Sequence, residues 1–373
     1  MKKILLFSRD PGGANTIIPL VEPLQNKGYN VKLFGKDVAL DKYKIAKLQS
    51  INIMDYVDSV EYEVIEQFLV SEKPDFIFTG TSADDFTEKY IWKASQKLGI
   101  PSFAILDQWM NYGLRFSNYG VAELNQYNMD KVHPYLPYKI CVMDEIAKNE
   151  AVKDGLEAEK IVITGQPYFE TLTKKMHSIN QMKIKKSEDF VITFASEPIT
   201  ETYKEDKNSE HYWGYTEKII FNDFIESLNE AIKLYNGKIV LILKLHPKEN
   251  PGKFDYLLQT FNNDKITLKI DKNSDSHEVM TSSDLICGMS SMFLIESAII
   301  NKPVISIQIG LKRENPFILD KIGILKSILT KEELVKNLKS IVIANKPSGY
   351  NFSIIKNPVE NIINEMERLL CQS

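Results

Sequence analysis

Short apolar runs alternate with amphipathic stretches along most of the chain. The first run, residues 4–7, is followed by Pro11-Gly12-Gly13 and then by apolar residues at helical spacing. The other strand-like runs of this half alternate with helical patterns in the same way and lie at 31–34, 76–78, 103–106, 140–143 and 161–163. Strands separated by helices are typical of parallel sheets that helices cover on both faces. The pattern predicts a Rossmann-type α/β domain over residues 1–172.

The same alternation returns after residues 173–188, a polar and basic stretch that we predict to be a linker. Residues 189–350 are predicted to form a second Rossmann-like domain, with strand-like runs at 190–194, 239–245, 266–270, 285–287 and 304–307. Residues 351–373 hold a final amphipathic helix, capped by Asn357, which we expect to pack back toward the first domain. The two domains are expected to face each other across a cleft, lined by loops at the carboxyl ends of both sheets.

Composition and charge narrow the possible partners. The 373 residues carry 46 Lys and Arg against 50 Asp and Glu, a formal net charge of −4, so no strong basic field would recruit nucleic acid. The three cysteines show no CxxC spacing, and Cys141 and Cys287 lie in apolar runs, which indicates buried, reduced thiols and a reducing compartment. No apolar window reaches the ~20 residues of a membrane span, and the start is too short for a signal peptide. We therefore expect a cytoplasmic protein with at most peripheral contact with the inner face of a membrane.

Two motifs of the second half have the chemistry of a phosphate site. His246-Pro247 ends an apolar strand, so the imidazole is expected at the sheet edge, where it could donate a hydrogen bond to a phosphate or act as a strand-end cap satisfied by backbone. Ser290-Ser291 follows another strand and opens a helix, where free N–H groups and the helix dipole favour an anion. Simple N-capping by serine is the alternative. Glu296, in the same helix, could reach a ribose hydroxyl or be an ordinary surface glutamate, and Ser196 ends a further strand where it could contact the same ligand.

Together, His246-Pro247 and Ser290-Ser291 resemble the HP and SS motifs of bacterial sialyltransferases, polysialyltransferases and CDP-glycerol glycerophosphotransferases. The resemblance covers mainly residues 190–310. It implies a GT-B fold, with an acceptor-side domain at 1–172 and a nucleotide-donor domain at 189–350. It also implies that the two motifs hold the phosphate of a CMP- or CDP-linked donor, without a metal ion or other cofactor.

The first domain offers two candidates for the general base. Asp107 follows the strand at 103–106, at a place similar to the D/E-D/E-G loop that carries the base in the sialyltransferase-like families, although Asp107-Gln108-Trp109 lacks that glycine. In the same loop, Trp109 and Tyr112 could stack on a sugar ring or be packing residues, and Arg115 could pair with a carboxylate or phosphate.

Asp10 is the rival base. It lies where the first strand turns into the first helix, next to Gly12 and Gly13, which let backbone approach a ligand closely. An inverting transfer needs such a carboxylate to accept the proton of the acceptor hydroxyl. Asp84-Asp85 is predicted to cap a helix, and we predict no metal site.

The leading hypothesis is an inverting, metal-independent glycosyltransferase. It would take a nucleotide-activated sugar, a CMP-linked nonulosonic acid for preference, and build a bacterial surface glycan on a glycan or glycolipid acceptor. The first alternative is a CDP-glycerol-type glycerophosphotransferase, and the next is a non-hydrolysing UDP-N-acetylglucosamine 2-epimerase. Gly113-Leu114-Arg115 resembles the Glu-Ala-Gly-Leu-Arg run of that epimerase family, with Asn111 in place of the glutamate. A binding or scaffolding protein that kept the fold without chemistry is the non-enzymatic alternative.

Overall fold

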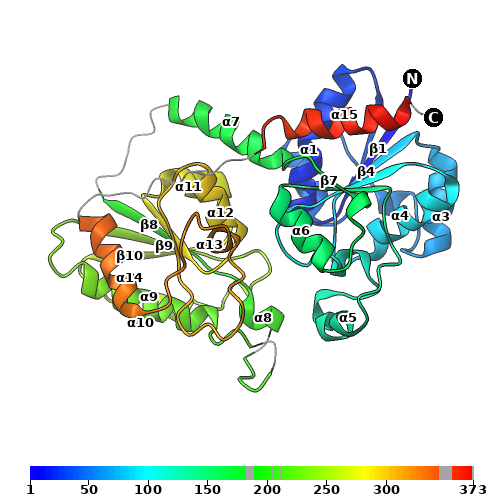
Figure 1. The fold of residues 1–373 in the computed structure, drawn as a ribbon. Helices are drawn as coiled ribbons and strands as arrows, with labels where there is room; N and C mark the ends of the chain where they lie inside the picture. The colour runs from blue at the N-terminus through cyan, green and yellow to red at the C-terminus, as the bar shows by residue number, and fades with distance from the viewer. Residues whose placement is uncertain (182–188, 204, 210–211, 344–354, 372–373) are drawn as a thin grey trace. The chain divides into compact units, whose positions relative to one another are not determined.

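The computed structural model describes residues 1–181, 189–203, 205–209, 212–343 and 355–371 (Figure 1). The chain divides into two compact units, the first formed by Met1–Thr171 with Ile354–Ser373 and the second by Leu172–Ser353. Each unit is a parallel sheet with helices on both faces. The predicted fold class, two Rossmann-like α/β domains, is therefore confirmed.

The first unit is built on a seven-stranded sheet in the order β3-β2-β1-β4-β5-β6-β7. All its strands pair in parallel, because each is joined to the next by a crossover connection. Their bounds are β1 (Lys3–Ser8), β2 (Asn30–Gly35), β3 (Ile51–Asn52), β4 (Phe76–Thr79), β5 (Ser102–Ile105), β6 (Lys139–Val142) and β7 (Ile161–Ile163). The strand order reverses between β1 and β4, which is where doubly wound sheets bind ligands at their carboxyl ends.

Helices cover this sheet on two faces. One face buries Ile17 and Leu20 of the first helix with Phe76 and Phe103, and the other packs Phe68 and Ile91 against Leu5 and Phe7. The helices are α1 (Pro11–Asn26), α2 (Val38–Ile45), α3 (Tyr62–Glu72), α4 (Phe86–Leu98), α5 (Leu124–Asp130), α6 (Glu145–Lys153) and α15 (Pro358–Leu370), with short 3-10 turns η1 (Ile53–Asp55), η2 (Leu114–Phe116), η3 (Val121–Glu123) and η4 (Ala158–Lys160).

The C-terminal helix α15 belongs to the first unit. Ile362, Ile363 and Met366 are buried in the same core as α1, and Glu367 pairs with Lys27 just beyond the end of α1. Figure 1 shows α15, in red, lying along the first unit beside α1. The apolar spacing in the sequence explains this contact, since these residues recur on one helical face. The prediction that the last helix packs back on the first domain is confirmed.

The second unit has a five-stranded parallel sheet in the order β10-β9-β8-β11-β12. Its strands are β8 (Phe190–Ala195), β9 (Ile239–Lys244), β10 (Ile266–Asp271), β11 (Leu285–Gly288) and β12 (Val304–Ser306). Its helices are α8 (Ile199–Tyr203), α9 (Glu217–Ala231), α10 (Leu257–Thr260), α11 (Ser276–Ser282), α12 (Met292–Ile299), α13 (Ile318–Lys321) and α14 (Lys331–Leu338), followed by a π-helical turn, η5 (Lys339–Ile343). The order reverses between β8 and β11, so the loops after these two strands lie together.

The predicted linker differs in part from the structure. Helix α7 (Pro167–Gln181) extends into residues 173–181 of that stretch, and 182–188 lie outside the described residues. Lysine, methionine and glutamine are good helix formers, so a helix forms there although no apolar stripe marks it. The linker assignment itself stays a prediction, and residues 344–354 and 372–373, which include parts of the predicted C-terminal segment, are also outside the described residues.

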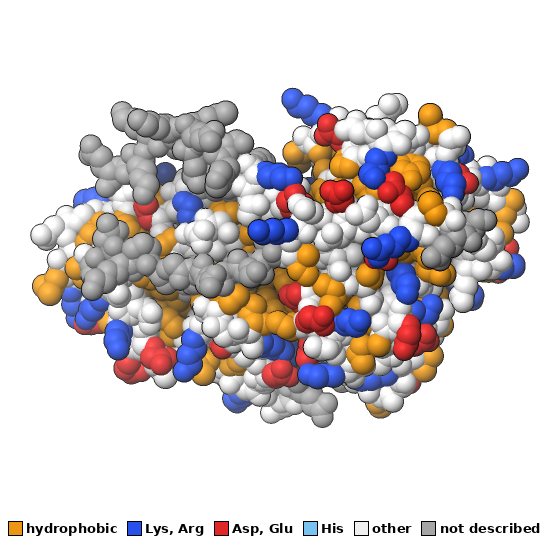
Figure 2. All heavy atoms as spheres, turned by 45° about the horizontal axis from the view of Figure 1, so that its top comes forward, with side chains coloured by type: hydrophobic (Ala, Val, Ile, Leu, Met, Phe, Trp, Pro, Cys, Tyr) orange, Lys and Arg blue, Asp and Glu red, His pale blue; other side chains and the backbone are white. Residues whose placement is uncertain are grey.

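Two smaller expectations concern cysteines and membranes. Cys141 and Cys287 are buried free thiols, as predicted, and burial raises the pKa of each well above its ordinary value. Among the described residues, no helix combines the length and apolar character that crossing a bilayer requires. Figure 2 shows basic and acidic side chains interspersed over the face it presents.

Candidate functional site

The carboxyl ends of β1 and β5 bring four predicted site residues together in the first unit. Asp10 is the N-cap of α1, directly after β1, and Gly12 and Gly13 form the first turn of that helix. The Asp107 carboxylate lies over this turn. It is so close that a methyl group added to Gly12 would be 1.8 Å from Asp107 Oδ2. Gly12 is thus required by close approach of a side chain from the neighbouring loop.

Arg115 fixes the Asp107 carboxylate. Its Nη1 donates to Asp107 Oδ1 at 2.8 Å, and also to the carbonyl oxygen and hydroxyl of Thr81 at 2.6 and 2.7 Å. The Arg115 side chain is 4% exposed and that of Asp107 is 15% exposed. The sequence predicted that Arg115 pairs with a carboxylate or a phosphate, and the structure provides the carboxylate from the same loop.

Asp10 lies in a more open setting. Its side chain is 29% exposed and pairs with Arg9 at 3.1 Å. Arg9 also binds Asp37 at 2.8 Å, and Lys36 binds Asp85 at 2.6 Å, so the rim of the strand ends carries alternating charges. Asp85 caps α4 through the N–H of Thr87, as predicted. The structure thus keeps both Asp10 and Asp107 as candidates for proton transfer, at one edge of one sheet.

Trp109 and Tyr112 pack inside the first unit. Trp109 is 9% exposed, stacks on Phe169 at 5.6 Å between ring centroids, and donates its indole N–H to Asp144. Tyr112 is 7% exposed, and burial raises the pKa of its hydroxyl. The structure favours packing over sugar stacking for both rings.

Sequence reasoning missed Glu88. This glutamate of α4 is fully buried, and its Oε2 accepts the backbone N–H of Ser82 in the loop after β4. Burial, with the charge of Asp10 as the next cause, raises the pKa of Glu88 to about 8. The only sequence signal is its place three residues after the N-cap Asp85, where a glutamate is ordinarily part of a surface capping box.

In the second unit, Glu197 occupies the helix end that the sequence assigned to a phosphate. Glu197 follows β8, and its Oε1 accepts the N–H groups of Ser290 and Ser291 at 2.5 and 2.9 Å, while its Oε2 accepts the Ser290 hydroxyl at 3.0 Å. These are the free donors of the α12 N-terminus, which favours an anion. Glu197 is buried, and burial raises its pKa to about 7. The donors of this turn thus bind a carboxylate of the chain itself, and phosphate binding at Ser290 and Ser291 stays a prediction.

His246 follows the end of β9, the strand that pairs with β8. Its Nδ1 accepts the N–H of Lys248 at 3.1 Å, so the neutral ring carries its proton on Nε2. Burial lowers the pKa of His246 to about 4, so the ring is neutral at pH 7 and acts as a hydrogen-bond donor without charge. The backbone N–H of Lys248 satisfies Nδ1, as the strand-end interpretation predicted. No described group is bonded to Nε2, and the donation of a hydrogen bond to a phosphate stays a prediction. Pro247 is exposed after β9.

Ser196 and Glu249 join the loops after β8 and β9. The Ser196 hydroxyl donates to Glu249 at 2.7 Å, and Glu249 also accepts the N–H of His246 at 2.7 Å. Glu249, Glu201 and Glu217 are the described group with the spacing of metal ligands, but the ammonium of Lys253 pairs with all three. We interpret this group as an ion-pair network that stiffens the His246 loop. Glu296 is half-buried in the middle of α12.

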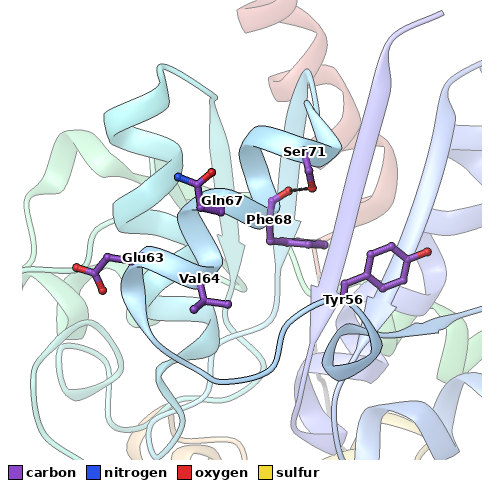
Figure 3. A pocket seen from close by; sticks show the side chains of 6 residues that line it. All are labelled: Tyr56, Glu63, Val64, Gln67, Phe68 and Ser71. Atoms are coloured by element: carbon purple, nitrogen blue, oxygen red, sulfur yellow. Dashed lines mark hydrogen bonds between the residues drawn. The ribbon is translucent and has the colours of Figure 1, made fainter.

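Two surface hollows lie away from these strand ends. One, of about 420 Å³, lies between α3 and Tyr56, with Val64 and Phe68 on its wall and Glu63 as its one charged lining residue (Figure 3). The other, of about 610 Å³, includes Pro74 and Pro101, which precede β4 and β5 at the amino edge of the sheet. No basic residue lines the first hollow. The second lies at the amino edge of the sheet, and ligands of such sheets bind at the carboxyl edge. We place the candidate site at the carboxyl edges.

No family model and no curated protein sequence matches this chain. Solved structures do. The UDP-GlcNAc 2-epimerase of Methanocaldococcus jannaschii, in complex with UDP-GlcNAc and UDP, is 17% identical with a TM-score of 0.63, over 98% of this chain and 99% of that one. MnaA of S. aureus with UDP is also 17% identical, with a TM-score of 0.63 over 99% and 97%. The UDP-GlcNAc 2-epimerase of Neisseria meningitidis, bound to UDP-GlcNAc, is 16% identical with a TM-score of 0.60 over 98% and 100%.

The chain has the fold of the UDP-GlcNAc 2-epimerases. This finding overturns the resemblance to sialyltransferases and CDP-glycerol glycerophosphotransferases, and with it the prediction of a CMP- or CDP-linked donor. The error has a physical cause. Two-residue motifs such as His246-Pro247 and Ser290-Ser291 mark strand ends and helix starts, which every Rossmann-like domain presents at its carboxyl edge. These motifs therefore indicated the carboxyl edge of the sheet, but they carried little information about which nucleotide binds there.

Proposed function

We propose that this chain is an enzyme that binds a UDP-linked N-acetylhexosamine and inverts the configuration at carbon 2 of the sugar, without an acceptor. The proposal replaces the glycosyltransferase hypothesis and takes up the epimerase alternative. The comparisons support it through the similarity, over at least 97% of both chains, to solved structures that contain UDP or UDP-GlcNAc.

One observation carries the proposal: two carboxylates, Asp10 and Asp107, flank the first turn of α1 in different settings. Inversion at carbon 2 requires that its proton leave one face of the sugar while the electron pair of the broken C–H bond forms a double bond to carbon 1 and expels UDP. A proton must then return to the other face of carbon 2 as UDP adds back to carbon 1, so the reaction needs an acid and a base rather than one group. Asp107 is held by the buried Arg115, whereas Asp10 is more exposed and paired with Arg9. Different environments are what assign different protonation roles to two carboxyl groups.

The Arg115–Asp107 pair also concerns the one residue by which this loop differs from the charged positions of the Glu-Ala-Gly-Leu-Arg run of the epimerase family. Asn111 stands where that family's run has a glutamate, and its backbone adopts a left-handed conformation with φ of 54°. Asp107, four residues earlier, supplies a carboxylate to Arg115 from the same loop. We propose that Asp107 takes the place of the missing glutamate.

The second unit would bind the diphosphate. The His246 Nε2–H is a neutral donor whose ring orientation is fixed by the Lys248 amide. The Ser290 and Ser291 amides are further donors, which the Glu197 carboxylate uses in this structure. A phosphate of the nucleotide would take over these donors from Glu197.

The test is to incubate the protein with UDP-GlcNAc alone and follow the sugar by proton NMR. We expect a mixture of the gluco and manno epimers, formed without release of free sugar. Asp107→Asn and Asp10→Asn should each lower the rate by roughly 10²–10⁴-fold, as loss of an acid or base group does. Surface variant Asp255→Asn is the control and should keep the wild-type rate. Unchanged UDP-GlcNAc with wild-type protein would refute the proposal.

A further inference from the structure

The carboxyl group of Glu88 is buried and forms no ion pair among the described residues. Oε2 accepts one backbone N–H, from Ser82, and Oε1 is buried with no hydrogen-bond partner among the described residues. Arg115, the nearby cation, directs Nη1 to Asp107 and Thr81 instead. An ionised carboxylate in such a place would lack the donors that stabilise its charge, so this geometry favours the protonated form.

The charged groups around Glu88 come from several elements. Asp10, at the start of α1, and Asp85, at the start of α4, act to raise the pKa of Glu88, and Arg115 of η2 acts to lower it. Burial is the largest cause, and the resulting pKa of about 8 agrees with the geometry. Glu88 also interacts electrostatically with Lys89, which donates to the carbonyl oxygens of Ala83 and Tyr119, and with the buried Tyr43.

Glu88 lies close to the first turn of α1, which Asp10 caps and over which Asp107 lies. A methyl group added to Gly80 would be 3.1 Å from Glu88 Oε1 and 2.8 Å from the Cα of Gly13. The Glu88 carboxyl group and the first turn of α1 therefore lie against the same point beside Gly80, so Glu88 is close to that turn. Asp10 caps that turn, so a charge on Glu88 would act on the Asp10 carboxylate at short range through a medium of low dielectric.

We propose that Glu88 is a positioning residue that stays protonated while Asp10 and Asp107 exchange protons with the substrate, and that loss of its proton switches this pair off. The second part rests on the proposed function. When neutral, Glu88 adds no charge behind α1. When ionised, it adds a negative charge near Asp10, which repels the Asp10 carboxylate and the turn that carries it.

The first test does not depend on catalysis. The pKa of Glu88 is about 8 in the folded protein against an ordinary 4.5, so between these values the folded chain holds a proton that the unfolded chain has lost. Stability from this group is complete below about pH 4.5 and is lost as pH rises to about 8. The urea midpoint of wild type, measured relative to Glu88→Gln, should therefore fall steadily from pH 5 to pH 8 and then level off.

Glu217→Gln is the matched control for this measurement, because Glu217 is also fully buried but pairs with Lys253. It should be less stable than wild type throughout the range, since Lys253 loses a partner. A wild-type midpoint that runs parallel to that of Glu88→Gln from pH 5 to 8 would mean that Glu88 is ionised in the folded state, and would overturn the proposal.

The second test is the pH profile of epimerisation. Wild type should lose activity, tenfold or more, between pH 7.5 and 9.5, and Glu88→Gln should keep its activity there. Burial also lowers the pKa of Lys89 to about 8, so Lys89→Arg, which stays charged, is the control and should keep the wild-type decline. A decline that persists in Glu88→Gln would overturn the switch. Absence of epimerisation in wild type would overturn the proposed function and the switch together, while the denaturation curves would still decide the protonation of Glu88.

Discussion

Oε1 of Glu197 accepts the backbone N–H of Ser290 at 2.5 Å, which places a carboxylate of the chain at the N-terminus of α12. The two residues come from the loops after β8 and β11, the strands between which the order of the second sheet reverses. Doubly wound sheets bind anionic ligands at this position. Any phosphate that uses the same N–H groups must compete with Glu197.

This relationship predicts that Glu197 weakens nucleotide binding. Glu197→Gln keeps the shape of the side chain and removes the negative charge, so the affinity for UDP at pH 8 should rise about tenfold, equivalent to ~1.4 kcal/mol. Because burial raises the pKa of Glu197 to about 7, its charge is lost as pH falls. Calorimetry at pH 6 and pH 8 should therefore show the advantage of Glu197→Gln shrinking at pH 6. Equal affinities of both proteins at both pH values would contradict the prediction.

His246 should contribute to UDP binding as a neutral donor. Removing one hydrogen bond to a charged acceptor costs about 1.5–3 kcal/mol, so His246→Ala should weaken UDP binding roughly tenfold or more. The pKa of about 4 means that this loss is the same at pH 6 and at pH 8. His277→Ala, in α11, is the control and should bind UDP like wild type. If the His246→Ala loss were confined to acidic pH, the ring would be acting as a cation and our account of it would be wrong.

Arg115 should be important for stability as well as for the site. Its side chain is almost fully buried and binds Thr81 and Asp107. Arg115→Met leaves Asp107 without its buried partner, so we expect the free energy of unfolding to fall by about 3 kcal/mol. Urea denaturation measures this directly. Arg368→Met removes an exposed arginine of α15 and should change stability by less than ~0.5 kcal/mol, and a similar loss in both variants would contradict our assignment.

Gly12 is predicted to be essential for activity and dispensable for folding. A methyl group at this position would lie 1.8 Å from Asp107 Oδ2, so Gly12→Ala must displace that carboxylate. A displacement of about 1 Å can lower a rate ~10²-fold, and we expect a loss of that size in kcat with circular dichroism unchanged. Gly252→Ala is the control, because its nearest neighbour would be 3.5 Å away. Full activity in Gly12→Ala would remove Asp107 from the proposed site.

Periodicity in the sequence was sufficient to predict most of the fold. The apolar runs gave both parallel sheets, since a strand that is covered on both faces must be apolar at every position. The hydrophobic periodicity missed β3 (Ile51–Asn52), which is too short to produce a pattern. It also missed the helix α7, whose polar residues form a helix by propensity.

Only the site residues that follow the ends of strands could be predicted from the sequence. Asp10, Gly12, Asp107 and Arg115 follow strands β1 and β5, so their proximity follows from the topology. The burial of Trp109 depends on Phe169 and Asp144, which are distant in the sequence. Glu88 and Glu197 look like surface glutamates next to helix starts, and only the contact of each with the loop after another strand reveals a buried carboxyl group.

The exchange of hydrogen at carbon 2 tests the central claim most directly. With UDP-GlcNAc in deuterated water, the account predicts that wild-type protein introduces deuterium at carbon 2 of both epimers, as detected by NMR, and that Asp107→Asn does so at least a hundredfold more slowly. Binding of UDP-GlcNAc without any deuterium at carbon 2 would contradict it.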